Sequence, residues 1–94
     1  MKKVNLYFAT ETDKQLNKIL KLVSDIFSGY SLTKSIGGWY CKDTNKYIEE
    51  DSFNLMLFTN KLDEVEQLPK YINYVAKQKE TLIAIEDTNI KFIN

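Results

Sequence analysis

Two apolar stripes at helical spacing, separated by strand-like segments, constrain the fold of this chain more than any other feature of its sequence. The first stripe repeats at intervals of three and four residues and comprises Leu16, Ile19, Leu20, Val23, Ile26 and Phe27. Thr12 and Gln15 precede it with the spacing of a capping box, and Gly29 follows where a left-handed residue commonly ends a helix. The second stripe comprises Leu62, Val65, Leu68, Ile72, Val75 and Ala76. The stripes therefore predict two amphipathic helices.

The second helix has two possible beginnings, because a proline lies inside its pattern. Asn60 can cap a helix that starts directly after it. Pro69 then either kinks that helix or opens another one as its first residue, with residues 61–67 forming a separate short turn. The sequence alone leaves both arrangements open.

The remaining segments have the composition and alternation of β-strands. The predicted strands are residues 4–9, 30–36 continuing at 39–41, 47–50, 53–59, 81–86 and, as a short terminal strand, 90–93. Gly37 and Gly38 interrupt the second strand, either as a bulge or as a place where backbone or ligand approaches closely. Residues 42–46 are polar and have the length of a hairpin loop.

The order strand, helix, hairpin, helix, strand is typical of an α+β, ferredoxin-like βαββαβ fold, here with a long central hairpin. We expect one domain spanning residues 1–94. Right-handed crossovers place both helices on one face of the sheet. Residues 53–59 carry apolar side chains toward both faces, so we expect the uncovered face to meet another copy in a dimer or trimer.

The charged composition narrows the possible functions. The chain has no histidine and no arginine, and its net charge is +0. The commonest zinc ligand, the usual base at neutral pH and the bidentate phosphate fork are therefore missing. We expect no metal, no cofactor, no nucleic acid, no membrane partner and no enzymatic activity.

Cysteine usage and hydropathy favour a cytoplasmic protein. Cys41 is the only cysteine, so no intrachain disulfide can form. We find neither a signal-peptide core nor an apolar run near the roughly 18 residues that cross a membrane. The expected location is the cytoplasm of a bacterium, or of its host cell if a phage encodes the chain.

Residues 35–66 resemble the middle of the CutA family. The resemblance is carried by Ser35-Ile36, Trp39, the turn, the acidic run Ile48 to Asp51, the apolar strand ending in Thr59 and an acidic helix start. It implies a ferredoxin-like trimer of the wider PII-like superfamily, with ligand sites between subunits. Leu68-Pro69-Lys70-Tyr71 lacks the histidine of the CutA His-Pro-Tyr region, so metal binding is not implied.

A second resemblance concerns small phage and bacterial proteins of mostly uncharacterised function. In these proteins, as in residues 27–39 here, a helix ending near glycine precedes a Gly-Gly-Trp hairpin. If the resemblance holds, the chain acts in counter-defence by sequestering a nucleotide signal of the host.

The central hairpin carries the predicted ligand-binding residues, which are Lys34, Gly37, Gly38, Trp39, Tyr40 and Lys42. Glycine backbone amides can approach a ligand closely, an indole can stack on a base, and the lysines can meet phosphates as point charges. The structural alternative is a glycine bulge that curves the hairpin while Trp39 packs against a neighbouring subunit. Tyrosines 30, 47, 71 and 74 could add to such an interface.

Two further features have both a functional and a structural interpretation. Glu49 and Asp51 could converge on a divalent cation, or the run from Glu49 to Asp51 could be a solvated hairpin edge that resists aggregation. Cys41 could be a nucleophile, but no histidine can activate it, so a half-buried strand residue is the better account.

The sequence thus favours a small, non-enzymatic, oligomeric protein that binds a nucleotide-like or small anionic ligand in an intersubunit cleft near Trp39. The alternative is a phage-type inhibitor that binds a host protein through Tyr47, Glu49 and Asp51 together with Trp39 and Tyr40. A metal-tolerance role through the CutA resemblance is undermined by the missing histidine.

Overall fold

The computed structural model describes residues 1–91 and 93, with the side chain of Trp39 outside the described part. Its elements are, in chain order, β1 (Lys2–Phe8), α1 (Asp13–Phe27), β2 (Ser31–Cys41), β3 (Lys46–Thr59), α2 (Leu62–Ala76) and β4 (Leu82–Asp87). This is the predicted βαββαβ order, and the α+β ferredoxin-like fold is confirmed.

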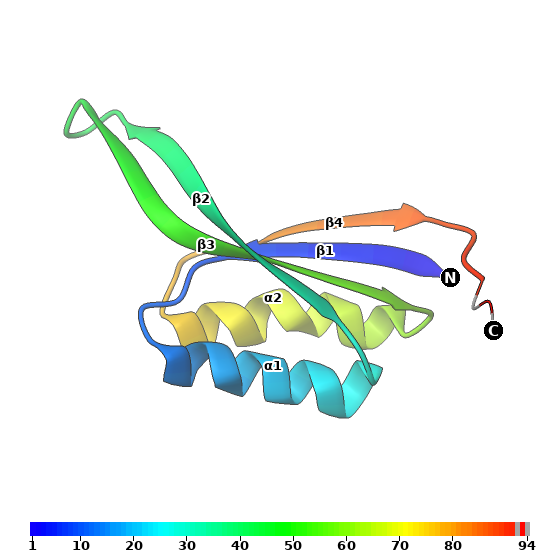
Figure 1. Cartoon of the computed structure of the whole chain (residues 1–94). Coiled ribbons are helices and arrows are strands. Elements are labelled where there is room, and N and C mark those ends of the chain that lie inside the picture. Colours follow the sequence, from blue (N-terminus) through cyan, green and yellow to red (C-terminus); the bar gives the residue numbers. More distant parts are fainter. Residues whose placement is uncertain (92, 94) are drawn as a thin grey trace.

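The four strands form one antiparallel sheet in the order β2-β3-β1-β4. Both helices lie against one face of this sheet, as Figure 1 shows, because each βαβ crossover turns to the same side. Leu6 in the central strand β1 stands opposite Leu55 of β3 and Ile83 of β4. The register therefore places every second residue of β1 and β3 toward the helices.

The hydrophobic core fills the space between this face and the helices. Strands β1 and β3 contribute Val4, Leu6, Phe8, Leu55 and Leu57, and the helices contribute Ile19, Val23, Val65, Leu68 and Ile72. These helical residues belong to the two predicted stripes, so the amphipathic patterns identified the buried faces correctly.

The helix boundaries differ in part from the predictions. The capping box at Thr12 and Gln15 is confirmed in both directions. At the end of α1, however, the left-handed residue is Ser28 with φ 70°, not Gly29, and the Ser28 amide donates to the Ser24 carbonyl. A short side chain tolerates this conformation, so the glycine is not needed for it.

The prediction that Asn60 caps the second helix is wrong. Helix α2 begins after Lys61, whose side chain makes no capping hydrogen bond at this end. The Lys61 amide instead binds the Thr59 hydroxyl at 2.9 Å, and its ammonium donates to the Ile26 carbonyl at 2.6 Å. Lys61 thus satisfies a free carbonyl in the last turn of α1 and links the two helices.

Pro69 lies inside one continuous helix, so residues 61–67 do not form a separate turn. The terminal strand predicted at residues 90–93 includes Phe92, which is outside the described residues. The described residues of that range, 90, 91 and 93, are not part of a strand.

The bulge predicted at the glycine pair is absent from the described backbone. Gly37 pairs with Glu50 and Gly38 with Glu49 in an unbroken ladder, so β2 and β3 are single long strands. Gly37 has a packing role instead, because a β-carbon there would approach the Ser52 hydroxyl to 3.3 Å. The glycine leaves room for the hydroxyls of Ser35 and Ser52, which lie 3.1 Å apart.

The far half of the β2–β3 hairpin projects beyond the sheet as an arm (Figure 1). We define this arm as residues 35–52, because β1 pairs with β3 only from Phe53 onward. Within the described structure the two arm strands pair only with each other. The molecule measures 51 × 25 × 25 Å, and its radius of gyration is 14.5 Å, against about 12 Å for a compact chain of this length.

The face of the sheet opposite the helices is uncovered by any described element. This open face carries Tyr7 and Phe58, which are 40% and 37% exposed, and Leu82, which is 66% exposed. Among them lies Asn54, whose Oδ1 atom is buried without a hydrogen-bond partner in the described part of the chain. The exposed apolar side chains mark a surface suited to a further partner.

Candidate functional site

A groove of about 400 Å³ lies where the arm leaves the body of the protein. We call it the arm-base groove; it is lined by Ala9, Thr10, Glu11, Glu50, Asp51, Ala76, Lys77 and Gln78. Three segments meet here, namely the β1–α1 loop, the lower arm and the α2–β4 loop. The sheet register brings them together, because Phe8 pairs with Phe53 and Tyr7 with Leu82 at this end of the sheet.

Gln78 holds the two loops of the groove in place. Its carbonyl oxygen accepts a hydrogen bond from the Ala9 amide at 3.2 Å, and its amide group donates to the Thr81 hydroxyl at 2.8 Å. The Thr81 hydroxyl in turn donates to Asn73 Oδ1 at 2.7 Å. The groove walls are therefore fixed by side-chain bonds to both loops, not by packing alone.

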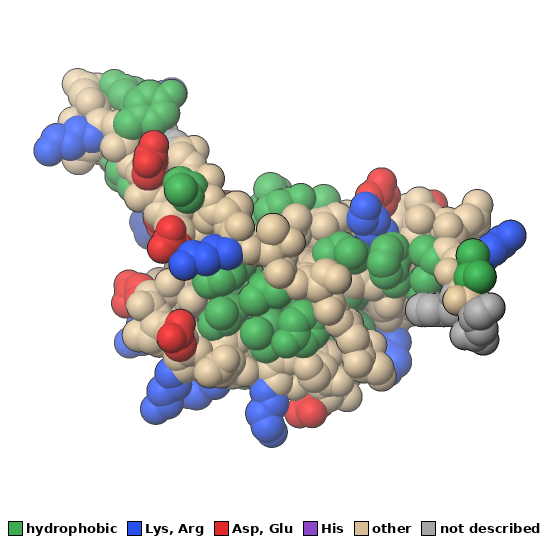
Figure 2. All heavy atoms as spheres, viewed as in Figure 1, with side chains coloured by type: hydrophobic (Ala, Val, Ile, Leu, Met, Phe, Trp, Pro, Cys, Tyr) green, Lys and Arg blue, Asp and Glu red, His purple; other side chains and the backbone are tan. Residues whose placement is uncertain are grey.

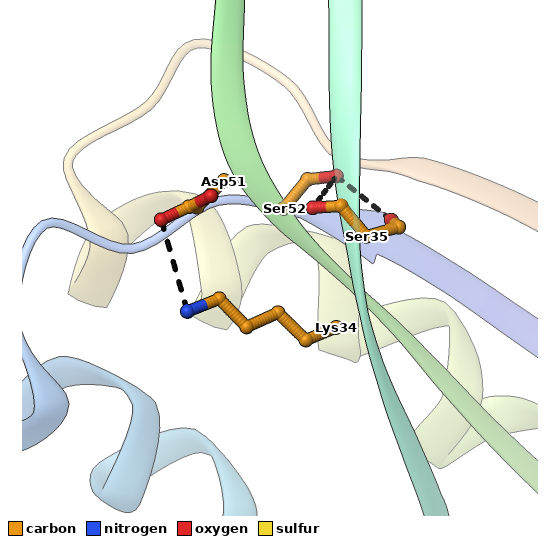
Figure 3. Close-up of polar contacts among 4 residues, drawn as sticks. All are labelled: Lys34, Ser35, Asp51 and Ser52. Carbon is orange, nitrogen blue, oxygen red and sulfur yellow. Dashed lines mark hydrogen bonds and ion pairs between the residues drawn. The ribbon is translucent and has the colours of Figure 1, made fainter.

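The groove contains charges of both signs. Figure 3 shows the Lys34 ammonium reaching toward Asp51 from the neighbouring strand, with 3.7 Å between Nζ and Oδ2. Glu11 lines the groove from the β1–α1 loop and Lys77 from the end of α2, whereas the Glu50 side chain points to the opposite side of β3 from Asp51. Such a mixture suits a ligand that carries both positive and negative groups.

A second hollow, the end cavity, lies at the opposite end of the sheet and has a volume of about 390 Å³. It is lined by Phe27, Ser28, Gly29, Tyr30, Ser31, Met56, Leu57 and Phe58. Its wall is mostly aromatic and aliphatic, with two serines as the polar side chains. Hollows of this size and composition commonly receive an aromatic group.

The predicted ligand-binding residues are distributed along the arm instead of surrounding one pocket in the single chain. Lys34 lies at the arm base, Tyr40 stands near the tip opposite Tyr47, and Lys42 lies in the turn. Because side chains alternate along a strand, Gly37 and Gly38 face opposite sides of the arm. The side chain of Trp39 lies outside the described residues. Binding at these positions stays a prediction.

The predicted interaction residues share one side of the arm. Tyr47, Glu49 and Asp51 alternate along β3 and therefore point the same way. Figure 2 shows a mixture of acidic and apolar side chains along the arm. Their role in binding a protein also stays a prediction.

Cys41 is partly exposed beside the turn at the arm tip. A hydrogen bond with the Thr44 side chain is the main cause that lowers the pKa of the Cys41 thiol below its ordinary value, and backbone hydrogen bonds add to it. The thiolate is therefore present at lower pH than in an ordinary cysteine.

We expect Thr44→Val to raise the pKa of the Cys41 thiol, because valine removes the hydroxyl that stabilises the thiolate. The check is the pH dependence of the alkylation rate with iodoacetamide, whose midpoint should move upward in the variant. Thr33→Val, a matched change on the exposed part of β2, should leave the midpoint unchanged. Equal midpoints in all three proteins would contradict the assigned role of Thr44.

Sequence reasoning missed the groove residues in the two loops, Thr10, Glu11, Lys77 and Gln78. None belongs to a motif, and each is a common surface residue type. The available signal was topological: in the predicted fold, the end of the first strand and the end of the second helix lie beside the base of the hairpin. The groove could therefore have been located, although not its hydrogen bonds.

Comparison with known sequences gives no match, since neither a family model nor a curated protein resembles the chain significantly. Solved structures do match. CutA1 from Pyrococcus horikoshii is 17% identical over 98% of this chain and 87% of its own, with a TM-score of 0.70. The PII-like protein CutA from Nostoc is 12% identical over 95% of this chain and 82% of its own, with a TM-score of 0.68. The chain therefore has the predicted CutA and PII-like fold.

A phage SAM lyase in complex with S-methyl-5′-thioadenosine matches equally well. It is 12% identical over 92% of this chain and 80% of its own, with a TM-score of 0.70. The prediction that the chain is not an enzyme is contradicted by this comparison, because an enzyme has the same fold. The fold therefore does not exclude catalysis.

Neither a metal site nor a membrane span is found among the described residues. No group of three or more histidine, cysteine, aspartate or glutamate residues is placed to hold a metal ion, within the described residues. In the same part of the chain, neither helix has the length and hydrophobicity needed to cross a bilayer.

Proposed function

We propose that the chain is a self-associating protein that binds a nucleotide-like ligand in the arm-base groove, with S-adenosylmethionine as the first candidate, and cleaves it. The observation that carries this proposal is that carboxylates and the lysine Lys77 line the same groove, where Asp51 is also paired with Lys34 of the neighbouring strand. The shared fold with a phage SAM lyase supports the choice of ligand class. The proposed place of action is the cytoplasm of a bacterium, as expected from the lone thiol.

The charges of the groove match those of S-adenosylmethionine. This ligand carries a sulfonium, an ammonium and a carboxylate. Glu11 and Asp51 can face the two cationic groups, while Lys77 can face the carboxylate. Glu11 makes no side-chain ion pair within the described residues, so its charge is available to a ligand.

The reaction class is compatible with a chain that lacks histidine. The ligand's own carboxylate can attack the carbon of the carbon–sulfur bond and close a lactone, while the electron pair of the broken bond moves to sulfur and a neutral thioether leaves. The leaving group takes up no proton, so no general acid is needed. Carboxylates near the sulfonium can orient the ligand, and a closed site can exclude water.

Self-association is supported by the excess surface of the single chain. Its accessible area is 7043 Å². A compact monomer of 11.0 kDa exposes about 5,600 Å², so roughly 1,400 Å² is in excess. Stable interfaces bury about 800 Å² per partner, and the open face and the arm supply that area.

The proposal predicts that Glu11→Gln weakens the binding of S-adenosylmethionine but not the binding of S-methyl-5′-thioadenosine. The first ligand is cationic and the second is neutral, so only the first loses an electrostatic partner. We expect about a tenfold rise in Kd, which corresponds to roughly 1.4 kcal/mol. Isothermal titration calorimetry measures binding, and chromatography of the reaction mixture measures release of the thioether.

Glu66→Gln is the matched control, because Glu66 is an exposed acid on α2 outside the groove. Its affinity for both ligands should equal that of the unchanged protein. If Glu11→Gln weakened the binding of both ligands equally, an electrostatic contact between Glu11 and the cationic ligand would be contradicted. No binding of either ligand by the oligomer would overturn the proposed function.

A further inference from the structure

The arm ends in a pair of aromatic side chains that remain exposed in the single chain. Tyr40 and Tyr47 stand opposite each other, with ring centroids 5.8 Å apart in an edge-to-face arrangement. Tyr47 is 79% exposed and Tyr40 is 49% exposed. A two-stranded ribbon with exposed aromatic rings is only marginally stable in water, so a covering partner would stabilise it.

The pair is held in a fixed geometry before any partner binds. The Tyr40 hydroxyl donates to Asn45 Oδ1 at 2.9 Å, and Asn45 has a left-handed φ of 54° in the turn. Asparagine tolerates this conformation better than most residues. A rigid aromatic tip loses little conformational entropy on docking.

We propose that the two tip tyrosines insert into the end cavity of a second copy. The cavity volume of about 390 Å³ can receive aromatic rings, and its aromatic wall includes Phe27, Tyr30 and Phe58. Ser28 and Ser31 stand at this cavity as polar partners for a tyrosine hydroxyl. This contact rests on the self-association proposed above and names the surfaces that make it.

The tip cannot reach the cavity of its own chain. Ser31 lines the cavity and Tyr40 lies nine residues farther along the same strand. Nine residues of extended strand span about 30 Å, and the strand is paired throughout. Any contact between tip and cavity is therefore a contact between two copies.

The native cysteine at the arm tip supplies a direct test. A second thiol is introduced at the cavity as Gly29→Cys, where a β-carbon meets nothing within 4 Å, or as Ser31→Cys. Under mild oxidation we expect disulfide-linked multimers, and mass spectrometry should identify the pair of peptides joined by the disulfide between Cys41 and the introduced cysteine. The yield should exceed by at least fivefold that of Tyr74→Cys, an exposed position on α2.

Two controls separate this contact from other outcomes. Adding Cys41→Ser to either cavity variant should abolish the linked product, which excludes pairing between two introduced thiols. Tyr47→Ser should weaken assembly at least tenfold in sedimentation, whereas Tyr74→Ser should not.

The contact is overturned if the unmodified chain assembles but neither cavity position links to Cys41 above the Tyr74→Cys level. Such a result leaves the proposed function intact, because ligand binding by the assembly is measured separately. If the chain stays monomeric at all concentrations, both the contact between tip and cavity and the proposed function are overturned. If Tyr47→Ser does not affect assembly, the contact is also contradicted. The end cavity would then be a site for a small ligand or a host protein.

Discussion

Tyr7→Lys is expected to convert the assembly into folded monomers. Tyr7 lies on the open face near the arm end of the sheet, with Asn54 and Leu82 as its neighbours across the two adjoining strands. A lysine there would bury an unpaired ammonium between two sheets, at a cost of about 3 kcal/mol or more. The Kd for assembly should therefore rise more than a hundredfold. Analytical ultracentrifugation over a concentration series measures the change.

Tyr74→Lys is the matched control for this experiment. Tyr74 is 83% exposed on α2, on the other side of the molecule from the open face. The substitution is the same tyrosine-to-lysine change, but Tyr74 has no predicted contact with another copy. Circular dichroism should show native structure in both variants. An assembly that survives Tyr7→Lys would exclude the open face as the interface between copies.

Leu6→Ala is expected to cause the largest loss of stability. Leu6 is fully buried in the central strand, between Leu55 and Ile83 on the neighbouring strands. Deleting its side chain leaves a cavity and should lower the free energy of unfolding by about 3 kcal/mol. A chain of 94 residues has roughly 5–14 kcal/mol in total. The midpoint of thermal unfolding should fall by about 12–24 °C.

Urea unfolding in the Tyr7→Lys background isolates this effect, because a monomer unfolds without dissociation. Leu62→Ala serves as the control, since Leu62 is 38% exposed at the start of α2 and should lose less than about 1 kcal/mol. Equal losses in the two variants would contradict the position of Leu6 at the centre of the core.

The core and the sheet order could be predicted because they depend on patterns spread over many residues. The stripes around Val23 and Ile72 specify which helix faces are buried, and the crossover rule then places both helices on one side. The predictions failed where a single residue decided the outcome. Ser28 takes the conformation predicted for Gly29, and the contacts of Lys61 replace the cap predicted at Asn60.

The candidate site was less predictable than the fold. The groove depends on the hydrogen bond between Gln78 and the Ala9 amide, which joins two loops almost 70 residues apart in sequence. No local sequence pattern predicts such a bond. The glycine pair was predicted to let a ligand approach the backbone, with a bulge as the structural alternative, whereas the ladder runs through it and Gly37 makes room for Ser52. Excluding catalysis from missing histidine was wrong because not every reaction needs a proton carrier.

The position of the arm and the end cavity at opposite ends of the sheet has a geometric consequence. A contact between two different surfaces of identical chains repeats from each copy to the next. If the rotation between neighbours closes without translation, the result is a ring of fixed size. If a small rise remains, the same contact extends into a filament. The angle at which the arm leaves the body near Lys34 and Asp51 therefore decides between a closed particle and an open polymer.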